Sequence, residues 1–179
     1  MFKKAAAVLA AVAGIAAPIN AQERTLLVRF DGAIAVHPVA NVAGVMNPSD
    51  GTFPDLKLNV VRGVNPAGPW RIAALKANIY TDGRIVVSGR GLLLAAGNSI
   101  GQNANQSVFA TLICDAAIPF IERSTSPSGV PLESNGDFRI DDVLNPAPGD
   151  CASPVLLIRA ASNRPWFAAG IRENPDDDR

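Results

Sequence analysis

Histidine-dependent chemistry has a single candidate in this chain, because His37 is the only histidine. A Ser-His-Asp or Cys-His mechanism, or a metal site with several histidines, would have to use it. His37 stands in Val-His-Pro-Val, where an apolar alternation ends in a proline. A lone histidine at a strand end is typical of a surface residue, so we expect it to take no part in catalysis.

Paired carboxylates can catalyse glycoside hydrolysis without histidine, and the chain offers Asp141 and Asp142. Adjacent strand residues point to opposite faces of a sheet, so these two are not expected to act together. Asp115 follows Cys114 and is expected beside a disulfide. We interpret these acids as solvated residues of turns and strand ends, with a carboxylate-dependent glycan hydrolase as the alternative.

Two other patterns could bind ligands. Glu133-x-Asn135-x-Asp137 resembles part of an acidic calcium loop, but it lacks the glycine and the terminal glutamate of an EF-hand. A hairpin turn at Asn135 explains the same residues. Trp70 and Trp166 could stack on a sugar, but tryptophan after proline at a strand entry favours a core or rim position. We therefore expect no metal and no cofactor.

The two cysteines are Cys114 and Cys151. An even number of cysteines in an oxidising compartment predicts a disulfide. A metal site would need more Cys or His ligands, and a catalytic thiol would need a base, for which His37 is the sole candidate. The sequence therefore predicts that Cys114 and Cys151 are joined.

Residues 1–21 have the pattern of a secretory signal peptide. Lys3 and Lys4 are followed by an apolar run from Ala5 to Ala17 and a short polar exit ending at Ala21. This run is shorter than the ~20 residues that a bilayer requires, so we expect cleavage rather than a membrane span. The pattern predicts a periplasmic or extracellular protein.

Removing this segment leaves 158 residues with 14 Lys and Arg and 16 Asp and Glu, a formal charge of −2. Such a chain has no basic field for nucleic acid or anionic lipid. The expected partner is therefore an unknown protein or glycan. We expect one domain over residues 22–172 and a disordered acidic tail over residues 173–179.

The segment from Trp70 to Gly97 predicts a long hairpin around a two-residue Asp82-Gly83 turn of type I′. This turn would place Ile79 opposite Val86. One face would then carry Leu75, Ala77, Ile79 and Val86, and the other Tyr80, Ile85 and Val87.

Further strands are expected along the rest of the chain. They are a long strand within residues 22–39 with a bulge or bend at Gly32, a strand within residues 56–64, strands at 108–114, 155–160 and 166–171, and a hairpin around Asn135-Gly136. A hairpin turn at Asp31-Gly32 is the alternative to the long first strand, but it would scatter the apolar residues over both faces. No helical periodicity persists, and prolines and glycines separate short β-rich runs. The sequence predicts an all-β class, an antiparallel β-sandwich or jelly-roll-like domain of eight or nine strands.

This composition favours a secreted, non-enzymatic module whose role is binding, envelope structure or assembly. The argument is that the chain offers one histidine, one tyrosine and no metal-ligand cluster. A glycan hydrolase that uses carboxylates remains the alternative.

Overall fold

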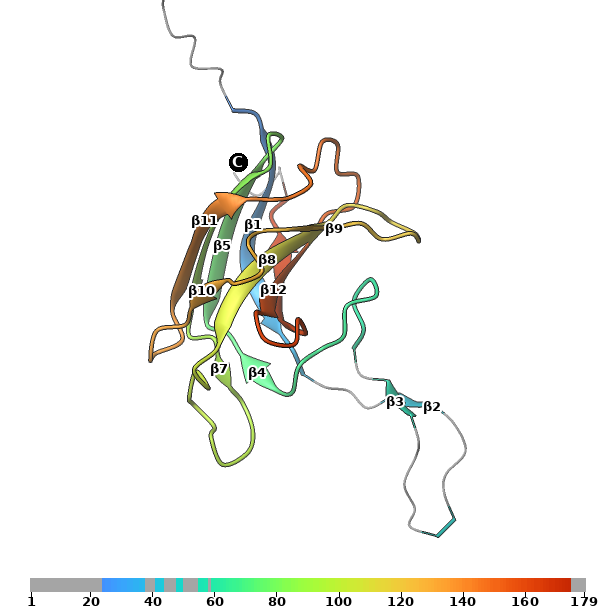
Figure 1. The fold of residues 1–179 in the computed structure, drawn as a ribbon, viewed down its shortest axis with the longest axis vertical. Coiled ribbons are helices and arrows are strands. Elements are labelled where there is room, and N and C mark those ends of the chain that lie inside the picture. Colours follow the sequence, from blue (N-terminus) through green and yellow to red (C-terminus); the bar gives the residue numbers. More distant parts are fainter. Residues whose placement is uncertain (1–23, 38–40, 44–47, 50–54, 58, 175–179) are drawn as a thin grey trace, which may run out of the picture.

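The computed structural model describes residues 24–37, 41–43, 48–49, 55–57 and 59–174 (Figure 1). The expected signal peptide, Pro38 and most of the expected acidic tail lie outside these residues. None of the described residues forms a helix that is long and apolar enough to cross a membrane.

The described chain is built from antiparallel strands. They are β1 (Leu26–Ala35), β2 (Asn41–Ala43), β3 (Asp55–Lys57), β4 (Trp70–Arg71), β5 (Ala74–Tyr80), β6 (Arg84–Arg90), β7 (Leu93–Leu94), β8 (Ser107–Ile113), β9 (Glu122–Ser124), β10 (Val130–Pro131), β11 (Phe138–Val143), β12 (Val155–Ala160) and β13 (Trp166–Arg172). One large sheet has the order β10-β8-β12-β13-β1-β5-β6-β11, and β9 also pairs with β8. The predicted all-β, antiparallel class is confirmed.

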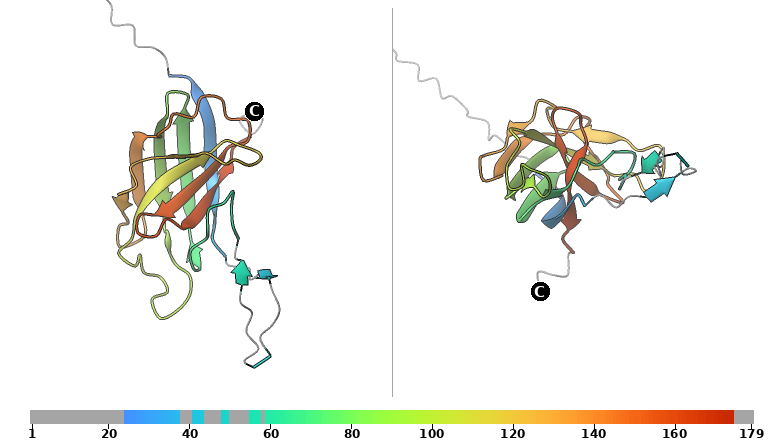
Figure 2. Two further views of the ribbon diagram at one scale, coloured as in Figure 1. Left: turned by 45° about the vertical axis from the view of Figure 1, so that its right-hand side comes forward. Right: turned by 90° about the horizontal axis from the view of Figure 1, so that it is seen from below.

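The large sheet curls until its two ends nearly meet, which gives a sandwich-like cross-section (Figure 2). At one end of this meeting line the backbone N–H of Glu133 donates to the carbonyl of Asp137 over 2.9 Å. At the other end Ser124 and Asn145 exchange backbone hydrogen bonds of 3.2 and 2.9 Å. We call the line between β9–β10 and β11 the seam. A cavity of about 80 Å³ lies along it, where no ladder joins the described strands β10 and β11.

The core fills the inside of the curled sheet. Its fully buried side chains come from strands on all sides and include Leu75, Ile79, Ile85, Val87, Val108, Leu112, Leu156 and Ile158. β8 and β12 are buried on both faces, as expected for strands that read as continuous apolar runs. These two adjacent strands are the best-covered part of the fold.

The predicted register of the β5–β6 hairpin is wrong by one residue. Ile79 pairs with Ile85, because the loop contains three residues, Thr81 to Gly83. Gly83 alone takes the left-handed conformation there, with φ +90°, and its N–H donates to the carbonyl of Tyr80 over 3.0 Å. This is the geometry of a three-residue hairpin loop rather than a type I′ turn.

The one-residue shift exchanges the two faces of β6. Ile85 and Val87 are fully buried and share the core face with Leu75, Ala77 and Ile79. Val86, predicted on that face, is on the outside and half-buried.

The predicted bulge in β1 is confirmed at Gly32, which has φ +85° where the pairing with β13 shifts register. A bulge inserts one residue, so the burial phase reverses after it. Val28 and Phe30 are buried before it, whereas beyond it Ala35 is buried and Ile34 is 62% exposed. Ile34 therefore does not share a buried face with Phe30.

The segment before the central hairpin forms less regular structure than predicted. Of the strand expected within residues 56–64, the first two residues belong to β3, which pairs with β2, residue 58 lies outside the described residues, and Val60 is 49% exposed. Further on, Pro66 forms a bridge with Trp166, and the N–H of Ala67 donates to the carbonyl of Trp166 over 3.0 Å. This brings residues 59–69 against β13.

The two ends of the large curled sheet carry different segments of the chain. The strand pairings place four features at the same end of the sheet: the start of β1, the end of β13, the β5–β6 loop and the end of β8. The pairs that show this are Leu26–Tyr80, Phe30–Arg172, Arg84–Val143 and Ile113–Val155. Both cysteines also lie there, so we call this the disulfide end. β4 and β7 lie toward the opposite end (Figure 1).

Candidate functional site

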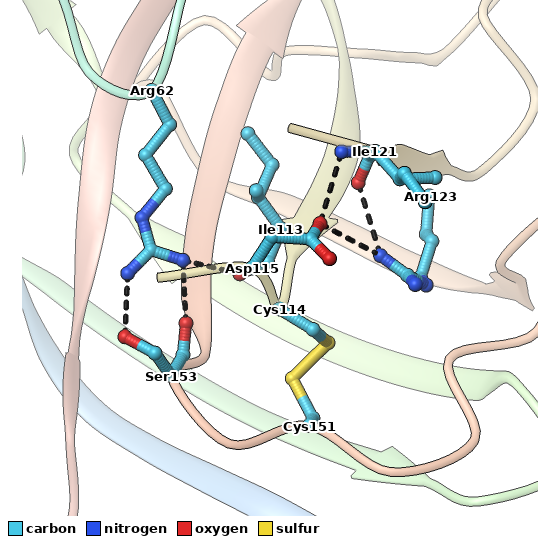
Figure 3. Close-up of a disulfide and its surroundings, with 8 residues drawn as sticks. All are labelled: Arg62, Ile113, Cys114, Asp115, Ile121, Arg123, Cys151 and Ser153. Atoms are coloured by element: carbon cyan, nitrogen blue, oxygen red, sulfur yellow. Dashed lines mark hydrogen bonds and ion pairs between the residues drawn. A yellow bond between two sulfur atoms is a disulfide. The ribbon is translucent and has the colours of Figure 1, made fainter. Parts of the chain in front are cut away.

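The predicted disulfide between Cys114 and Cys151 is confirmed. Cys114 directly follows β8, and Cys151 lies in the connection that enters β12. The backbone N–H of Ser153 also donates to the carbonyl of Cys114 over 3.2 Å. The disulfide therefore joins the end of β8 to the segment that enters β12, at the point where the loop after Cys114 begins (Figure 3).

Arg62 reinforces the disulfide from a distant segment. Its Nη1 donates to the carbonyls of Ile113 and Ser153, over 3.1 and 2.6 Å, and its Nη2 donates to Ser153 Oγ over 2.6 Å. Ile113 precedes one cysteine and Ser153 follows the other. A single guanidinium thus bonds to both chain segments that the disulfide joins (Figure 3).

Asp115 closes the base of the loop on the other side. Its Oδ2 accepts from the N–H of Ile121 over 2.9 Å and pairs with Arg123 Nη1 at 3.5 Å. Arg123 Nη1 also donates to the carbonyl of Ile121 over 3.1 Å. The hydrogen bond from Ile121 is the main reason why the pKa of Asp115 lies below its ordinary value. Removal of water raises that pKa, and the charge of Arg123 lowers it.

The return strand β9 is tied down by a buried arginine. Arg159 Nη1 donates to Glu122 Oε2 over 2.6 Å, and its Nε donates to the carbonyl of Arg164 over 2.8 Å. The guanidinium carbon lies 5.3 Å from the centre of the Phe109 ring. The Arg159 side chain is only 7% exposed, so this pair is a fixed part of the structure.

Between these anchors the chain exposes residues Ala116–Ile121, which we call the apolar loop. It contains no charged residue. Ile118 is 81% exposed and Ile121 45% exposed, whereas Phe120 packs back against the core. The β8–β9 connection projects from the body of the fold (Figure 1). The disulfide and its polar contacts therefore hold an apolar loop out in solvent.

The predicted carboxylate candidates lie at the same end but are already paired. Asp141 accepts from Arg84 Nη2 over 2.9 Å and lies 3.7 Å from Arg139 Nη2. Asp142 accepts from the backbone N–H of Ser126 over 2.9 Å. Both line an open hollow of about 320 Å³. Their oxygens are bound by cations and backbone donors, which suits structural ion pairing.

Within the described residues, no catalytic site is assembled around His37. His37 is exposed just after β1, and its carbonyl accepts from Asn59 Nδ2 over 2.6 Å. Sequence reasoning overlooked a Gly-x-Ser-x-Gly spacing at residues 97–101. Ser99 lies there in a turn between β7 and β8, without the strand–turn–helix context that a nucleophile elbow requires.

The two tryptophans are core residues, as interpreted from the sequence. Trp70 is 3% exposed and stacks on Phe167 with ring centres 4.1 Å apart. Trp166 is 4% exposed, and its Nε1 donates to the carbonyl of Asn59 over 2.9 Å. Neither ring is available for stacking on a sugar.

The acidic pattern around Asn135 forms a turn. Asn135 Oδ1 accepts from the N–H of Asp137, and Asp137 Oδ1 accepts from the N–H of Gly91, each over 3.0 Å. Within the described residues, no group of three His, Cys, Asp or Glu side chains is placed to hold a metal ion.

Sequence reasoning missed the apolar loop and its arginine anchors. The six uncharged residues 116–121, which follow Cys114 and Asp115, were a usable signal, because such a run next to a disulfide has few ways to be buried. Arg62 and Arg159 gave no such signal, since their partners are far away in the chain.

No protein-family model, curated protein or solved structure matches the chain.

Proposed function

We propose that the protein is a secreted, non-enzymatic binding module that presents the apolar loop to a partner. The observation that carries this proposal is the 81% exposure of Ile118 on a loop held by the disulfide, Arg62 and Asp115. Large apolar side chains that stay exposed contribute no hydrophobic stabilisation to the fold, and exposed apolar patches commonly mark interaction sites. A rigidly anchored loop also loses little conformational entropy on binding.

The proposal includes a location for the protein, which is the periplasm or the extracellular space. The disulfide is compatible with an oxidising compartment, where such bonds persist. The signal-peptide pattern in residues 1–21 supports the same location.

A binding role fits the charged groups better than a hydrolytic one. Glycosidic chemistry needs one protonated acid and one carboxylate on opposite sides of a bound sugar. Asp141 is ion-paired with Arg84 and Arg139, and Asp142 accepts a hydrogen bond from a backbone donor. These contacts support structural roles for both acids.

Capture from the envelope fraction of the source cell tests the proposal. The mature, oxidised protein would be immobilised as wild type, as Ile118→Asp and as Ile100→Asp. Ile100 is the matched control, because it is 63% exposed in a loop away from the disulfide end. We expect Ile118→Asp alone to lose the captured partner, with unchanged thermal unfolding of both variants. Equal capture by all three proteins would contradict the proposed role of the loop.

A further inference from the structure

We propose that Asn135 is a deamidation site, and that opening of the seam controls how fast it reacts. Asn135-Gly136 is the only Asn-Gly pair in the chain. Asparagine deamidates fastest before glycine, because glycine has no side chain to shield its backbone nitrogen. The pair lies in the β10–β11 connection, at the opposite end of the sheet from the disulfide (Figure 1). The proposal does not rely on the proposed function.

The reaction needs only water and these two residues. The backbone nitrogen of Gly136 gives up its proton and attacks Cγ of Asn135, which forms a carbon–nitrogen bond and closes a succinimide ring. The side-chain amide leaves as ammonia. Water then opens the ring at one of its two carbonyls, and position 135 becomes either aspartate or isoaspartate. Water is consumed and ammonia is released, with no oxidation or reduction.

Hydrogen bonds in the folded turn oppose this attack. The N–H of Gly136 donates to the carbonyl of Glu133 over 2.8 Å, so the proton that must leave is held in place. Asn135 Oδ1 accepts from the N–H of Asp137 over 3.0 Å, which fixes the orientation of the side-chain carbonyl. Gly136 is buried, and its carbonyl accepts from the N–H of Leu92 over 2.9 Å. Both groups that must join are therefore held by other partners.

The contacts that keep the turn closed belong to one end of the seam. There the N–H of Glu133 donates to the carbonyl of Asp137 over 2.9 Å, and Asp137 Oδ1 accepts from the N–H of Gly91 over 3.0 Å. No ladder joins the described strands β10 and β11 beyond this point. Because few bonds must break, the turn can open without unfolding the sheet. When opening and closing are fast, the rate of a reaction in the open form follows its population.

The two products differ in their effect on the seam. Aspartate at position 135 keeps the oxygen that binds the N–H of Asp137, but it adds a negative charge between Glu133 and Asp137. Isoaspartate instead lengthens the backbone by one methylene. The adjoining backbone has little room for this, because a Cβ at Gly136 would lie 2.6 Å from the N and the O of Leu92. Isoaspartate therefore moves the turn away from Leu92 and leaves this end of the seam open.

Peptide mass spectrometry of the mature, oxidised protein, incubated at mildly alkaline pH, measures the reaction. One sample is kept folded and another is unfolded in urea, and the conversion of every asparagine is followed. We expect Asn135 to react first in urea, and to react at least about 10-fold more slowly in the folded protein, where only the open fraction reacts. A faster reaction at another asparagine in urea, or equal rates in the two samples, would overturn the proposal.

Two aspartate variants show whether the seam or global unfolding controls the rate. Asp137→Ala removes the bond to the N–H of Gly91 beside the turn, whereas Asp141→Ala removes an ion pair with Arg84 at the other end of β11. We expect Asp137→Ala to raise the rate at Asn135 in the folded protein by about 3-fold or more, the effect of losing one hydrogen bond. Asp141→Ala should leave it unchanged. An equal rise in both variants, or no rise with Asp137→Ala, contradicts control by the seam.

Hydrogen exchange of the wild type tests the same control if Asp137→Ala does not fold. The amide of Gly136 must be released for both exchange and deamidation, so its protection factor should equal the ratio of the unfolded and folded deamidation rates. We expect agreement within about 3-fold. A larger mismatch would show that opening of this turn does not set the rate, and the proposed control would be wrong.

Discussion

Single polar side chains determine the shape of the disulfide end. Arg62 and Arg159 each bond to segments far apart in the sequence, whereas Asp115 closes the base of the loop by contacts within eight residues of itself. For the buried Arg159, each hydrogen bond to its charged side chain contributes about 1.5–3 kcal/mol. The loop that they hold has little apolar burial of its own, so its order depends on these contacts.

The protonation of Asp115 should therefore affect stability in acid. Its pKa is lowered in the folded protein, mainly by the hydrogen bond from Ile121, so its contribution is present above the ordinary aspartate range. That contribution is lost as the pH falls through the lowered pKa. We expect Asp115→Asn to be less stable than wild type at neutral pH, with the difference shrinking below about pH 4. Urea unfolding of both proteins from pH 7 to pH 2 measures this. A difference that stays constant with pH would show that the charge of Asp115 is unimportant.

At the scale of elements, the β5–β6 hairpin shows why a register is hard to obtain from sequence. Ile85, Val86 and Val87 are all apolar, so either register buries apolar side chains. The Asp82-Gly83 pair also suits two loop types, since glycine supplies the positive φ in both. The N–H of Arg84 donates to Asp82 Oδ1 over 3.0 Å, which favours the three-residue loop.

Neighbouring valines test the observed register directly. Val87 is fully buried, and Val86 lies half-buried on the outer face. Val→Thr keeps the shape but adds a hydroxyl, which costs about 1–3 kcal/mol where it finds no partner. We expect Val87→Thr to lower the free energy of unfolding by this amount and Val86→Thr to change it by less than about 0.5 kcal/mol. Urea unfolding gives both values, and the reverse order would support the type I′ register instead.

The predictable parts of the fold are those with local signals. Residues 108–113 and 155–160 are continuous apolar runs, and they form the buried strands β8 and β12. The disulfide followed from the number of cysteines. The site was not predictable in the same way, because Arg62 meets Ser153 and Arg159 meets Glu122 only once the chain has folded. Such pairs leave no periodic pattern in the sequence.

Breaking the disulfide should destabilise the whole fold. The cysteines are 37 residues apart, and closing a loop of this length restricts the unfolded chain by about 4 kcal/mol in the chain-entropy model. We expect the double substitution Cys114→Ala and Cys151→Ala to lower the free energy of unfolding by about 2–4 kcal/mol. Denaturant unfolding of this variant beside the oxidised wild type measures the loss. No loss would mean that Arg62 and the core hold this end without the covalent bond.

At the scale of the whole molecule, β12 and the seam differ in how well they are paired and covered. β12 is paired on both edges, with β8 and β13, and is buried on both faces. Along the seam, backbone bonds link Ser124 to Asn145 and Glu133 to Asp137, and a cavity lies between them. Local opening is easiest where few apolar contacts and few ladder bonds must be broken.

Native-state hydrogen exchange should show this difference. We expect the amides of Leu156 and Ile158 to exchange only through global unfolding. The amides of Asn145 and Glu133 should exchange through local opening, with a free energy at least about 2 kcal/mol lower. Exchange followed by NMR at several low denaturant concentrations separates the two classes. A single opening free energy for all four amides would mean that the seam and the centre unfold together.

The position of β13 has a consequence for how the chain folds in time. The last strand of the sequence lies in the middle of the sheet, between β1 and β12. A chain that emerges from a ribosome or a membrane pore with its N-terminus first therefore leaves β1 and β12 with unpaired edges until Trp166–Arg172 follows. Exposed strand edges readily pair with other chains, and pairing between distant segments is slow. The sheet therefore closes only after β13 has emerged. Until then the edges of β1 and β12 are open to pairing with other chains.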